Sequence, residues 1–520
     1  MIENKIPDSW IETTLSDISF VITDGTHKTP KYVEKGVRFI SIMNIRPFKP
    51  INWDSYEKYI TESEHRELIK RAKPERDDIL FPRIGTMGFA KRIDWDEEVS
   101  IFVGLGLIKP IKQYILPKYL EYYMNSPLIY SLSHERATGT GRMTLALEES
   151  KKLPFPLCPL EEQKRIVAKL DAAFTHLDTL KAKLRRIPEL LKSFRQAVLT
   201  QAVTGKLTEE WRQTSIKIES GSCLIERIKQ LIDLRFIEEC EKADNEGRRR
   251  PKDQRKNKRA KEYDIDLPEL PTTWDYSRIE EISYLVTDGT HHTPKYKDSG
   301  VTFLSVKNVR PFKTLLHDIK FISREEHEEL IKRCKPEKGD ILYTKVGATF
   351  GYAALNMLDF EFSIFVSLAL IKPVKELLDC KYVELTMNSD VIFRQARERV
   401  SGIGTPDLHL IEIRDFKFPV PPLEEQKEIV KKVDVLFAKA DAIEAQYLSL
   451  KEKIDKLPQA LLAKAFRGEL VPQDEADEPA SLLLEKIQQL KKDLAKPKKE
   501  TPVKVKEKKI AKRPVKEKVF

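Results

Sequence analysis

The chain has 520 residues, with an apolar fraction of 41% and a charged fraction of 33%, so it can hold roughly three to four domains with buried cores and long solvated helices. Its formal net charge of +10 favours an anionic partner, with nucleic acid ahead of a membrane surface. Five scattered cysteines without a CxxC pair, the lack of any apolar run near roughly 18 residues and the lack of an apolar signal region favour the reducing cytoplasm over secreted or membrane-spanning classes.

Residues 1–157 carry the mixed pattern of a compact α/β domain. Short runs rich in β-formers at 37–42, 78–81 and 101–108 are bounded by Gly, Pro and Asp, as is typical of strands. A polar helical pattern at 62–71 lies between them. We therefore expect a first folded domain over 1–157.

A long helix is expected over 158–207. Pro159 suits a first helical position, and the two glutamates that follow face the positive end of the helix dipole. Apolar residues then recur at steps of three and four, which is typical of a coiled-coil seam, and Gly205 is a plausible stop. Pro188 falls inside this range and predicts a kink or a break, because an interior proline costs about 3 kcal/mol.

Residues 208–268 are predicted to hold a short helix, near 222–231, and a basic linker at 247–262. The Lys-rich tail at 493–520 has almost no apolar content. We expect both basic segments to be disordered, because neither can bury enough apolar surface. Two interpretations stay open for them: solvated spacers, or auxiliary contacts to phosphates.

The same order of patterns returns in the second half of the chain. The segment DGTHKTPKY at 24–32 recurs as DGTHHTPKY at 288–296, and PLEEQ at 159–163 recurs at 422–426. The unit is far longer than the roughly 20 to 50 residues of solenoid repeats, so it is a tandem duplication of a large module. We expect Pro458 to interrupt the second long helix. The duplication predicts a second α/β domain, a second long helix and a second short helix at 269–420, 421–470 and 471–492.

Each long helix is apolar along one stripe and must bury that stripe, most economically against the other helix. Two similar units in one chain can be related by an approximate two-fold axis, which would make the helix pair antiparallel. The expected fold class is therefore α/β plus long helices, with two tandemly duplicated α/β domains separated by an antiparallel pair of long coiled-coil-like helices.

The sequence carries no recognisable catalytic constellation. It lacks the GxxxxGK[ST] phosphate loop, the HExxH zinc motif and an Asn/Asp-Pro-Pro-aromatic tetrapeptide. His291 and His292 are a suggestive pair, but the first copy has His27 and Lys28, which argues against a shared metal site. We therefore predict no catalytic, cofactor or metal residue in this chain.

The repeated DGTHxTPxY segment has two interpretations. It can be a structural turn in which Asp24 and Asp288 satisfy loop amides, because Asp, Gly, Thr and Pro suit tight turns. It can also present Thr, His and Lys donors to phosphates or base edges. Both interpretations stay open.

Two Gly-rich segments, at 137–142 and 400–405, differ between the copies. Such differences on a shared scaffold fit two related readers of slightly different sequences, and they also fit drift on a surface loop. The substitutions from first to second copy are Arg142 to Thr405, Thr144 to Asp407 and Ala146 to His409.

Together these motifs resemble the specificity (S) subunit of a type I restriction–modification system. The resemblance rests on the two DGTH segments, the two PLEEQ helix starts, the helix ends at 201–207 and 465–472, and residues 477–483, and it covers about residues 7–490. It implies a DNA-reading subunit without its own active site, whose α/β domains are target recognition domains for the halves of a bipartite site. It also implies a helical spacer that docks methyltransferase subunits, two of them expected, which use S-adenosylmethionine, and nuclease subunits that use ATP and Mg²⁺.

Arg and Lys can hold phosphates or bind guanine, and each candidate can equally be a solvated charge. Since the two α/β domains are alike, we also expect similar half-sites in inverted orientation, hence a near-palindromic target. The candidate DNA contacts are Thr26, His27, Lys28, Lys31, Arg46, Arg83, Arg136 and Arg142 in the first domain, and Thr290, His291, His292, Lys295, Lys307, Arg310, Lys345 and Arg399 in the second.

Two rival functions remain open on the sequence. A coiled-coil scaffold that binds proteins would show no DNA sequence preference and little dependence on salt. An enzyme with an unrecognised site would cleave or methylate DNA by itself.

Overall fold

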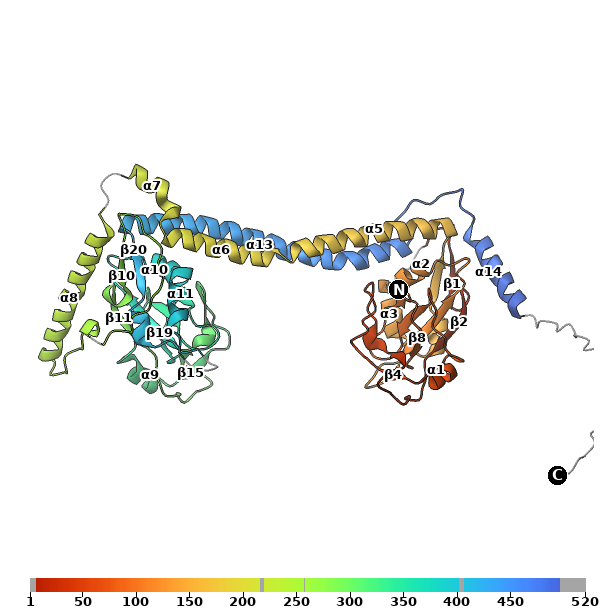
Figure 1. Ribbon diagram of the computed structural model, residues 1–520, viewed down its shortest axis with the longest axis horizontal. Helices are drawn as coiled ribbons and strands as arrows, with labels where there is room; N and C mark the ends of the chain where they lie inside the picture. Colours follow the sequence, from red (N-terminus) through yellow and green to blue (C-terminus); the bar gives the residue numbers. More distant parts are fainter. Residues whose placement is uncertain (1–5, 216–218, 257, 402–405, 496–520) are drawn as a thin grey trace, which may run out of the picture. The chain divides into compact units, whose positions relative to one another are not determined.

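The computed structural model describes residues 6–215, 219–256, 258–401 and 406–495 (Figure 1). The chain divides into two compact units: one combines the residues up to Lys183 with those from Leu450 onward, and the other is Leu184–Ser449. Each unit therefore contains one α/β domain and parts of both long helices.

The first α/β domain contains three small sheets. The largest is antiparallel with strand order β2-β8-β5-β6, the second has the order β4-β3-β7, and β1 pairs with β9. In the second sheet, β3 is antiparallel to β4 and parallel to β7. The strands are β1 (Ile11–Thr14), β2 (Ser19–Asp24), β3 (Val37–Ile40), β4 (Tyr59–Ile60), β5 (Ile79–Pro82), β6 (Lys91–Arg92), β7 (Val99–Ile101), β8 (Leu105–Pro110) and β9 (Pro154–Leu157).

Short helices cover these sheets. The polar helix expected at 62–71 is α1 (Glu62–Leu68), which begins where the Thr61 hydroxyl accepts a hydrogen bond from the Glu64 amide. The other helices of this domain are α2 (Pro117–Met124), α3 (Pro127–Glu135) and α4 (Leu147–Lys151).

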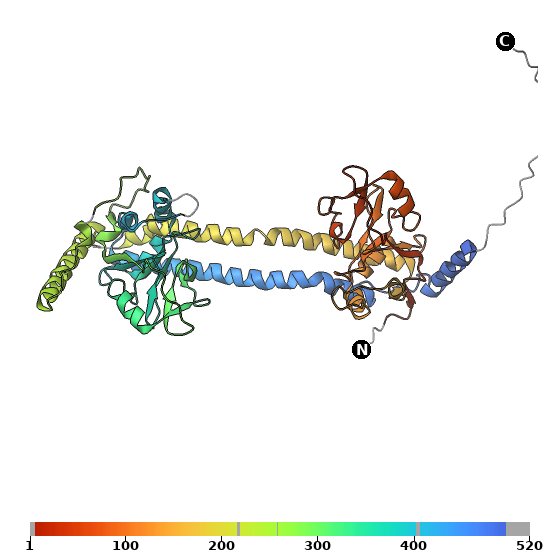
Figure 2. The same cartoon turned by 90° about the horizontal axis from the view of Figure 1, so that it is seen from below.

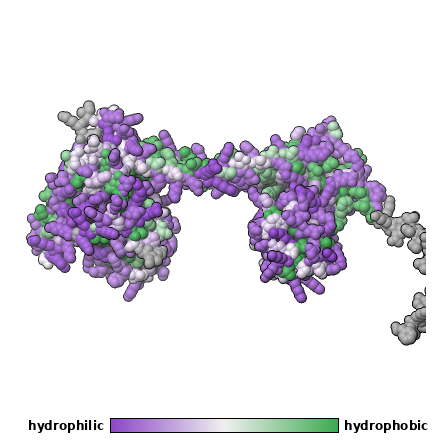
Figure 3. Space-filling view, in the orientation of Figure 1, coloured by the Kyte–Doolittle hydropathy of each residue, from purple (hydrophilic) through white to green (hydrophobic). Residues whose placement is uncertain are grey.

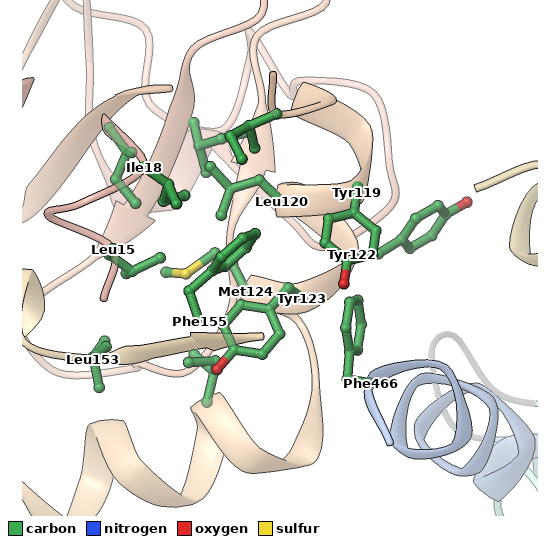
Figure 4. Packing of buried hydrophobic residues seen from close by; sticks show 14 of the residues in the cluster. Leu15, Ile18, Tyr119, Leu120, Tyr122, Tyr123, Met124, Leu153, Phe155 and Phe466 are labelled. Carbon is green, nitrogen blue, oxygen red and sulfur yellow. The ribbon is translucent and has the colours of Figure 1, made fainter. Parts of the chain in front are cut away.

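The core of the first unit includes a residue from the far end of the second long helix. Tyr119 and Tyr123 of α2 lie edge-on to Phe155 of β9, with ring centroids 5.8 and 5.2 Å apart (Figure 4). Phe466 packs on both tyrosines, at 5.3 and 5.0 Å. The first domain therefore completes its core with a segment more than 300 residues away in the sequence.

The second α/β domain repeats this layout. Its sheets have the orders β11-β19-β16-β17, β15-β12-β18 and β10-β20, with an additional β13-β14 hairpin. The strands are β10 (Asp275–Arg278), β11 (Ser283–Asp288), β12 (Val301–Leu304), β13 (Val309–Arg310), β14 (Lys313–Thr314), β15 (Lys320–Ile322), β16 (Ile341–Thr344), β17 (Ala353–Leu355), β18 (Phe362–Ile364), β19 (Leu368–Pro373) and β20 (Lys417–Val420). The helices are α9 (Arg324–Ile331), α10 (Cys380–Met387), α11 (Asp390–Arg399) and α12 (Leu410–Arg414).

Only one of the two long helices is continuous. The first is divided into α5 (Leu160–Leu184) and α6 (Ile187–Val203), so the break expected at Pro188 is present just ahead of it. The second, α13 (Leu423–Phe466), runs for 44 residues with Pro458 inside it. The expectation that Pro458 interrupts the helix is therefore wrong.

Packing explains the difference between the two prolines. Ile454 and Leu462, one turn on either side of Pro458, are buried, and their packing offsets the roughly 3 kcal/mol that an interior proline costs. Before Pro188, Leu184 and Ile187 are only half-buried, so less apolar burial is available there to offset that cost. The first helix therefore breaks at 185–186 and restarts, with Pro188 in its first turn.

The long helices pair in antiparallel fashion within each unit (Figure 2). In the second unit, Arg195 pairs with Asp441 (2.7 Å), whereas Lys432 donates to the carbonyl of Leu207 (3.1 Å). Going from Arg195 to Leu207 along the first helix, the contacting residue of α13 moves back from Asp441 to Lys432, so the two helices run in opposite directions. In the first unit, Lys181 near the end of α5 pairs with Asp455 (3.5 Å). The antiparallel pairing predicted from the duplication is confirmed.

Each PLEEQ segment ties its helix to the adjacent α/β domain. The buried carboxylate of Glu162 accepts hydrogen bonds from the indole Nε1 of Trp10 (2.8 Å) and from Nε2 of Gln473 (2.6 Å). Burial raises the pKa of this carboxyl. In the second unit, the indole of Trp274 donates likewise to the buried carboxylate of Glu425 (2.8 Å).

The segment RPFK, which occurs at 46–49 and again at 310–313, is a second attachment to the helices. Phe48 adopts a left-handed conformation (φ 55°) and stacks on Phe174 of α5 with 5.0 Å between ring centroids. Phe312 is also left-handed (φ 63°) and lies edge-on to Phe437 of α13, with 5.5 Å between ring centroids. A bulky residue in this region of backbone space costs of order 1–3 kcal/mol, so the aromatic contact must outweigh that strain.

The linker between the α/β domains is more ordered than expected. The predicted short helix is α8 (Gly221–Asn245), which follows α7 (Glu209–Thr214) and runs well beyond 222–231. Gln254 accepts a hydrogen bond from the Val286 amide (2.9 Å) and donates to the Ser283 carbonyl (3.3 Å). Strand β11 thus offers backbone partners, and a polar segment can dock there without apolar burial.

The last described helix is α14 (Ala480–Ala495). The Lys-rich tail from 496 onward lies outside the described residues. Across 6–215, 219–256, 258–401 and 406–495, no helix combines the length and the apolar character that a membrane crossing requires.

Candidate nucleic-acid interface

The first DGTH loop begins on a buried carboxylate. Asp24, at the end of β2, is 2% exposed, and its carboxylate pairs with the guanidinium groups of Arg71 and Arg83. The Nε2 atom of His27 lies 3.2 Å from the same carboxylate. The loop amides donate hydrogen bonds to backbone carbonyls of neighbouring strands instead; for example, Thr26 N donates to Ile101 O (3.1 Å). The expectation that Asp24 satisfies loop amides is therefore wrong.

The second copy is built in the same way with one different cation. The carboxylate of Asp288, equally buried, lies 2.5 Å from Arg333 and 3.6 Å from Lys345, and His291 Nε2 is 3.3 Å away. Here Lys345 stands where the first copy has an arginine, and it also lies 3.8 Å from Asp407. As in the first copy, the carboxylate holds side-chain cations.

The glycine and threonine of DGTH give the loop its path. A Cβ on Gly25 would lie 2.1 Å from the carbonyl oxygen of Ile101, so only glycine lets the loop lie against β7. The Thr26 hydroxyl accepts the amide of Lys28 (3.2 Å), and Thr290 accepts that of His292 at the same distance. The two hydroxyls are therefore engaged in the turn.

The residues that follow each Gly-rich segment lie close to the buried aspartate of the DGTH loop, with one basic side chain between them. Arg83 reaches Asp24 through one guanidinium nitrogen and donates from Nε to the carbonyl of Leu145 (3.1 Å). In the second domain, Lys345 lies between Asp288 and Asp407 in the corresponding way. The DGTH loop and the residues just after the Gly-rich segment, Leu145 and Asp407, therefore lie at the same end of each domain. Residues 402–405, with the predicted difference at Thr405, lie outside the described residues.

Most of the predicted contacts of the first domain are accessible. Arg136 is half-buried and donates to the carbonyl of Lys152 (3.1 Å). Arg83 is 7% exposed and engaged through Nε and Nη1, which favours a supporting role over direct contact with a ligand. Thr26 is half-buried, and the exposed members are His27, Lys28, Lys31, Arg46 and Arg142.

The second domain divides in the same way. Lys345 is 5% exposed, and Arg399, 6% exposed, pairs with Asp415 (3.1 Å), so both favour internal roles. Arg310 is half-buried and donates to the Val309 carbonyl (2.7 Å). Thr290 is half-buried, and the exposed members are His291, His292, Lys295 and Lys307.

Sequence reasoning missed Arg71 and Arg333, the half-exposed cations on the buried aspartates. Their signal was present, because Leu-Ile-Lys-Arg occurs in both copies, at 68–71 and 330–333. A cavity of about 450 Å³ opens beside the first of them. Its lining residues are Thr26, His27, Lys28, Glu67, Leu68 and Arg71.

The chemistry of this end of the domain is that of anion binding. Exposed Lys and Arg side chains and imidazoles are donors that suit phosphates and base edges. Within the described part of the chain, no three His, Cys, Asp or Glu side chains gather as they would to hold a metal ion.

The chain matches known proteins over most of its length. The sequence profile of the family described as Type I restriction modification DNA specificity domain matches twice, at residues 7–189 and 271–452. The type I restriction enzyme EcoBI specificity subunit of Escherichia coli is 31% identical over 341 residues, which are 64% of this chain and 63% of that protein, less than two thirds of it. The EcoKI specificity subunit of Escherichia coli strain K12 is 25% identical over 508 residues, which are 94% of this chain and 96% of that protein.

Solved structures share the fold. The HsdS subunit from Thermoanaerobacter tengcongensis aligns with a TM-score of 0.51 and 17% identity over 89% of this chain and 98% of that one. A chain from a study of complex assembly and conformational transition of the type I R-M system gives 0.54 and 18%, over 90% of this chain and all of that one. Since the two profile matches cover more than half of the sequence, this chain belongs to the type I restriction modification DNA specificity family.

Proposed function

We propose that this chain is the DNA-recognition subunit of a type I restriction–modification complex and that it binds a bipartite DNA target. The observation that carries the proposal is the double match to a DNA specificity domain. Each matched region contains a DGTH loop with exposed basic side chains beside it, and such side chains bind phosphates and base edges. In this proposal 1–157 and 269–420 are the two target recognition domains.

The long helices, over 158–207 and 421–470, are proposed to be the spacer and the docking surface for methyltransferase subunits. Large apolar side chains are exposed on both helices of the second unit, where Figure 3 shows apolar surface. Leu190 of α6 is 64% exposed and Leu448 of α13 is 58% exposed. Exposed apolar patches rimmed by polar residues are typical of protein–protein contacts.

The proposal assigns the chemistry to partner subunits. Two methyltransferase subunits would supply S-adenosylmethionine-dependent methylation, and nuclease subunits would use ATP and Mg²⁺. This chain would contribute the choice of DNA sequence and no catalytic residue, in keeping with its relatives, which are named specificity subunits.

The symmetry of the target is a finer part of the proposal. The two domains share the same strand orders and the same DGTH loop, so similar half-sites are expected. Antiparallel pairing of the long helices within each unit favours an inverted arrangement of those half-sites. We therefore expect a near-palindromic target with a fixed gap.

Selection of bound duplexes from a randomised DNA library tests the proposal, with the full chain co-expressed with its neighbouring methyltransferase. A two-part motif with a fixed gap is expected. Comparison of its two halves shows directly whether the target is near-palindromic. An intact complex that enriches no motif and whose binding barely depends on salt would contradict the proposal and favour a protein scaffold.

A further inference from the structure

The group formed by Asp24, Arg71 and Arg83, here named the Asp24 cluster, carries an excess of one positive charge, from two guanidinium cations against one carboxylate. The excess is displayed at the surface by Arg71, because Arg83 is buried while the Arg71 side chain is 53% exposed. Arg71 uses Nη2 and Nε on the Asp24 carboxylate and carbonyl. Its Nη1 has no hydrogen-bond partner among the described residues.

The cavity beside Arg71 has the donors that a phosphate needs. Lys28 and His27 line it together with Arg71, and the Lys28 ammonium makes no ion pair with any residue that the structure describes. The acidic lining residue, Glu67, is paired with Lys70 (2.6 Å). The Lys28 ammonium and Nη1 of Arg71 thus line one open depression beside His27, and Asp24 fixes the central guanidinium in place.

We propose that this depression binds a backbone phosphate of DNA, with Arg71 as its central donor. The inference rests on the proposed DNA-binding function and assigns Arg71 a sequence-independent contact within it. The reason is the chemistry of the site: Arg71 is held by a buried carboxylate beside the ammonium of Lys28, and such a cationic group suits a phosphate oxygen, which carries no sequence information. The repeat places this group on the scaffold that both domains share, since Asp288, His291 and Arg333 recur in the second domain.

The second domain forms a weaker version of the same site. Arg333 and Lys345 stand against two carboxylates, Asp288 and Asp407, so the corresponding group has no net charge. The first domain has Thr144 in the place of Asp407. Phosphate should therefore be held more strongly beside Arg71 than beside Arg333.

The test uses the full chain with its methyltransferase and two DNA probes, the selected duplex and a duplex with both half-sites scrambled. Arg71→Gln should weaken both probes by the same factor and should make the slope of log K against log salt shallower by about 0.9. The ratio of wild-type to variant affinity would then be about 3.5-fold larger at 50 mM than at 200 mM salt. Arg66→Gln, an equal charge change on α1 outside the cavity, is the matched control and should change the slope less.

Asp407→Asn is a second test, in which DNA binding should become stronger. Misfolding of a variant would weaken binding, so it cannot mimic this result. The substitution removes the neutralising charge and should strengthen binding to both probes and steepen the slope. Loss confined to duplexes altered at one position would overturn the inference by making Arg71 a base reader. An unchanged slope for both variants would overturn it by making the cluster structural.

Failure of the inference and failure of the proposed function look different. If the unchanged complex enriches a motif while Arg71→Gln leaves the slope unchanged, only the phosphate site is wrong. If no motif is enriched but Arg71→Gln still flattens the slope on the scrambled duplex, the phosphate site stands and sequence recognition fails. If the unchanged complex binds neither probe, both are wrong.

Discussion

At the scale of single residues, Glu162 is a charged group held where water cannot reach it. The residue is 1% exposed, and its carboxylate accepts hydrogen bonds from Trp10 and Gln473. Because burial raises its pKa in the folded protein, the folded state binds this proton more tightly than the unfolded chain does. The stability that protonation contributes is complete below the unfolded pKa, near 4.5, and is lost as the pH rises through the folded pKa.

Glu162→Gln should remove this pH dependence. We expect the wild-type chain to lose stability relative to the variant between pH 4.5 and pH 7, because only the wild type then holds a buried charge. Urea unfolding at the two pH values, followed by tryptophan fluorescence, measures the difference. The exposed neighbour Glu161 provides the control Glu161→Gln. A stability difference that is the same at both pH values would contradict the expectation.

Arg142 is the exposed basic residue of the first Gly-rich segment, and the second copy has threonine at the matching position. Arg142→Thr should change the preferred bases in one half-site only, by about 1–3 kcal/mol in binding free energy if this residue reads a base. Binding to duplexes altered in either half measures the effect. Equal weakening on every duplex would make Arg142 a phosphate contact instead.

At the scale of elements, Pro458 makes α13 less stable than its sequence could allow. Pro458→Ala should raise the free energy of unfolding by about 1–3 kcal/mol, because the alanine amide can complete a helical hydrogen bond. Pro188→Ala is the matched control and should change little, since Pro188 lies in the first turn of α6, where no amide partner is needed. Urea unfolding followed by helical circular dichroism gives both values. A neutral or destabilising Pro458→Ala would show that the α13 packing depends on the proline.

The sequence predicts the elements better than it predicts the contacts between them. The duplication, the PLEEQ helix starts and the antiparallel helix pairing follow from periodicity and repeats, which are local or self-similar signals. The partners of Glu162, at Trp10 and Gln473, are set by the tertiary fold and leave no such signal. For the same reason the docked linker and the continuous α13 were not predictable, since packing outweighed composition and propensity there.

The candidate site shows the same limit. Residue type alone cannot separate Arg83, which is buried against Asp24, from Arg142, which is exposed. Only the fold brings the end of β2 together with the residues that follow α1 and β5, and so makes Arg83 a support and Arg71 a surface donor.

At the scale of the whole molecule, we expect the two domains to be exchangeable, because both meet their helices through the same Trp–Glu contact. Replacing residues 271–420 by a second copy of 7–157 should therefore give a target with two identical half-sites in inverted orientation. Library selection with the chimera and its methyltransferase measures this, and the reciprocal chimera is the control. A direct repeat of half-sites would contradict the inverted arrangement.

Phe466 also imposes an order on the making of this protein. A ribosome releases Tyr119 and Tyr123 more than 300 residues before the phenylalanine that covers them. At roughly 5–20 residues per second, the nascent first domain waits on the order of 15–70 s with an aromatic face uncovered. A premature stop codon before Phe466 consequently damages the N-terminal domain, although every residue of that domain's own sheets has been synthesised.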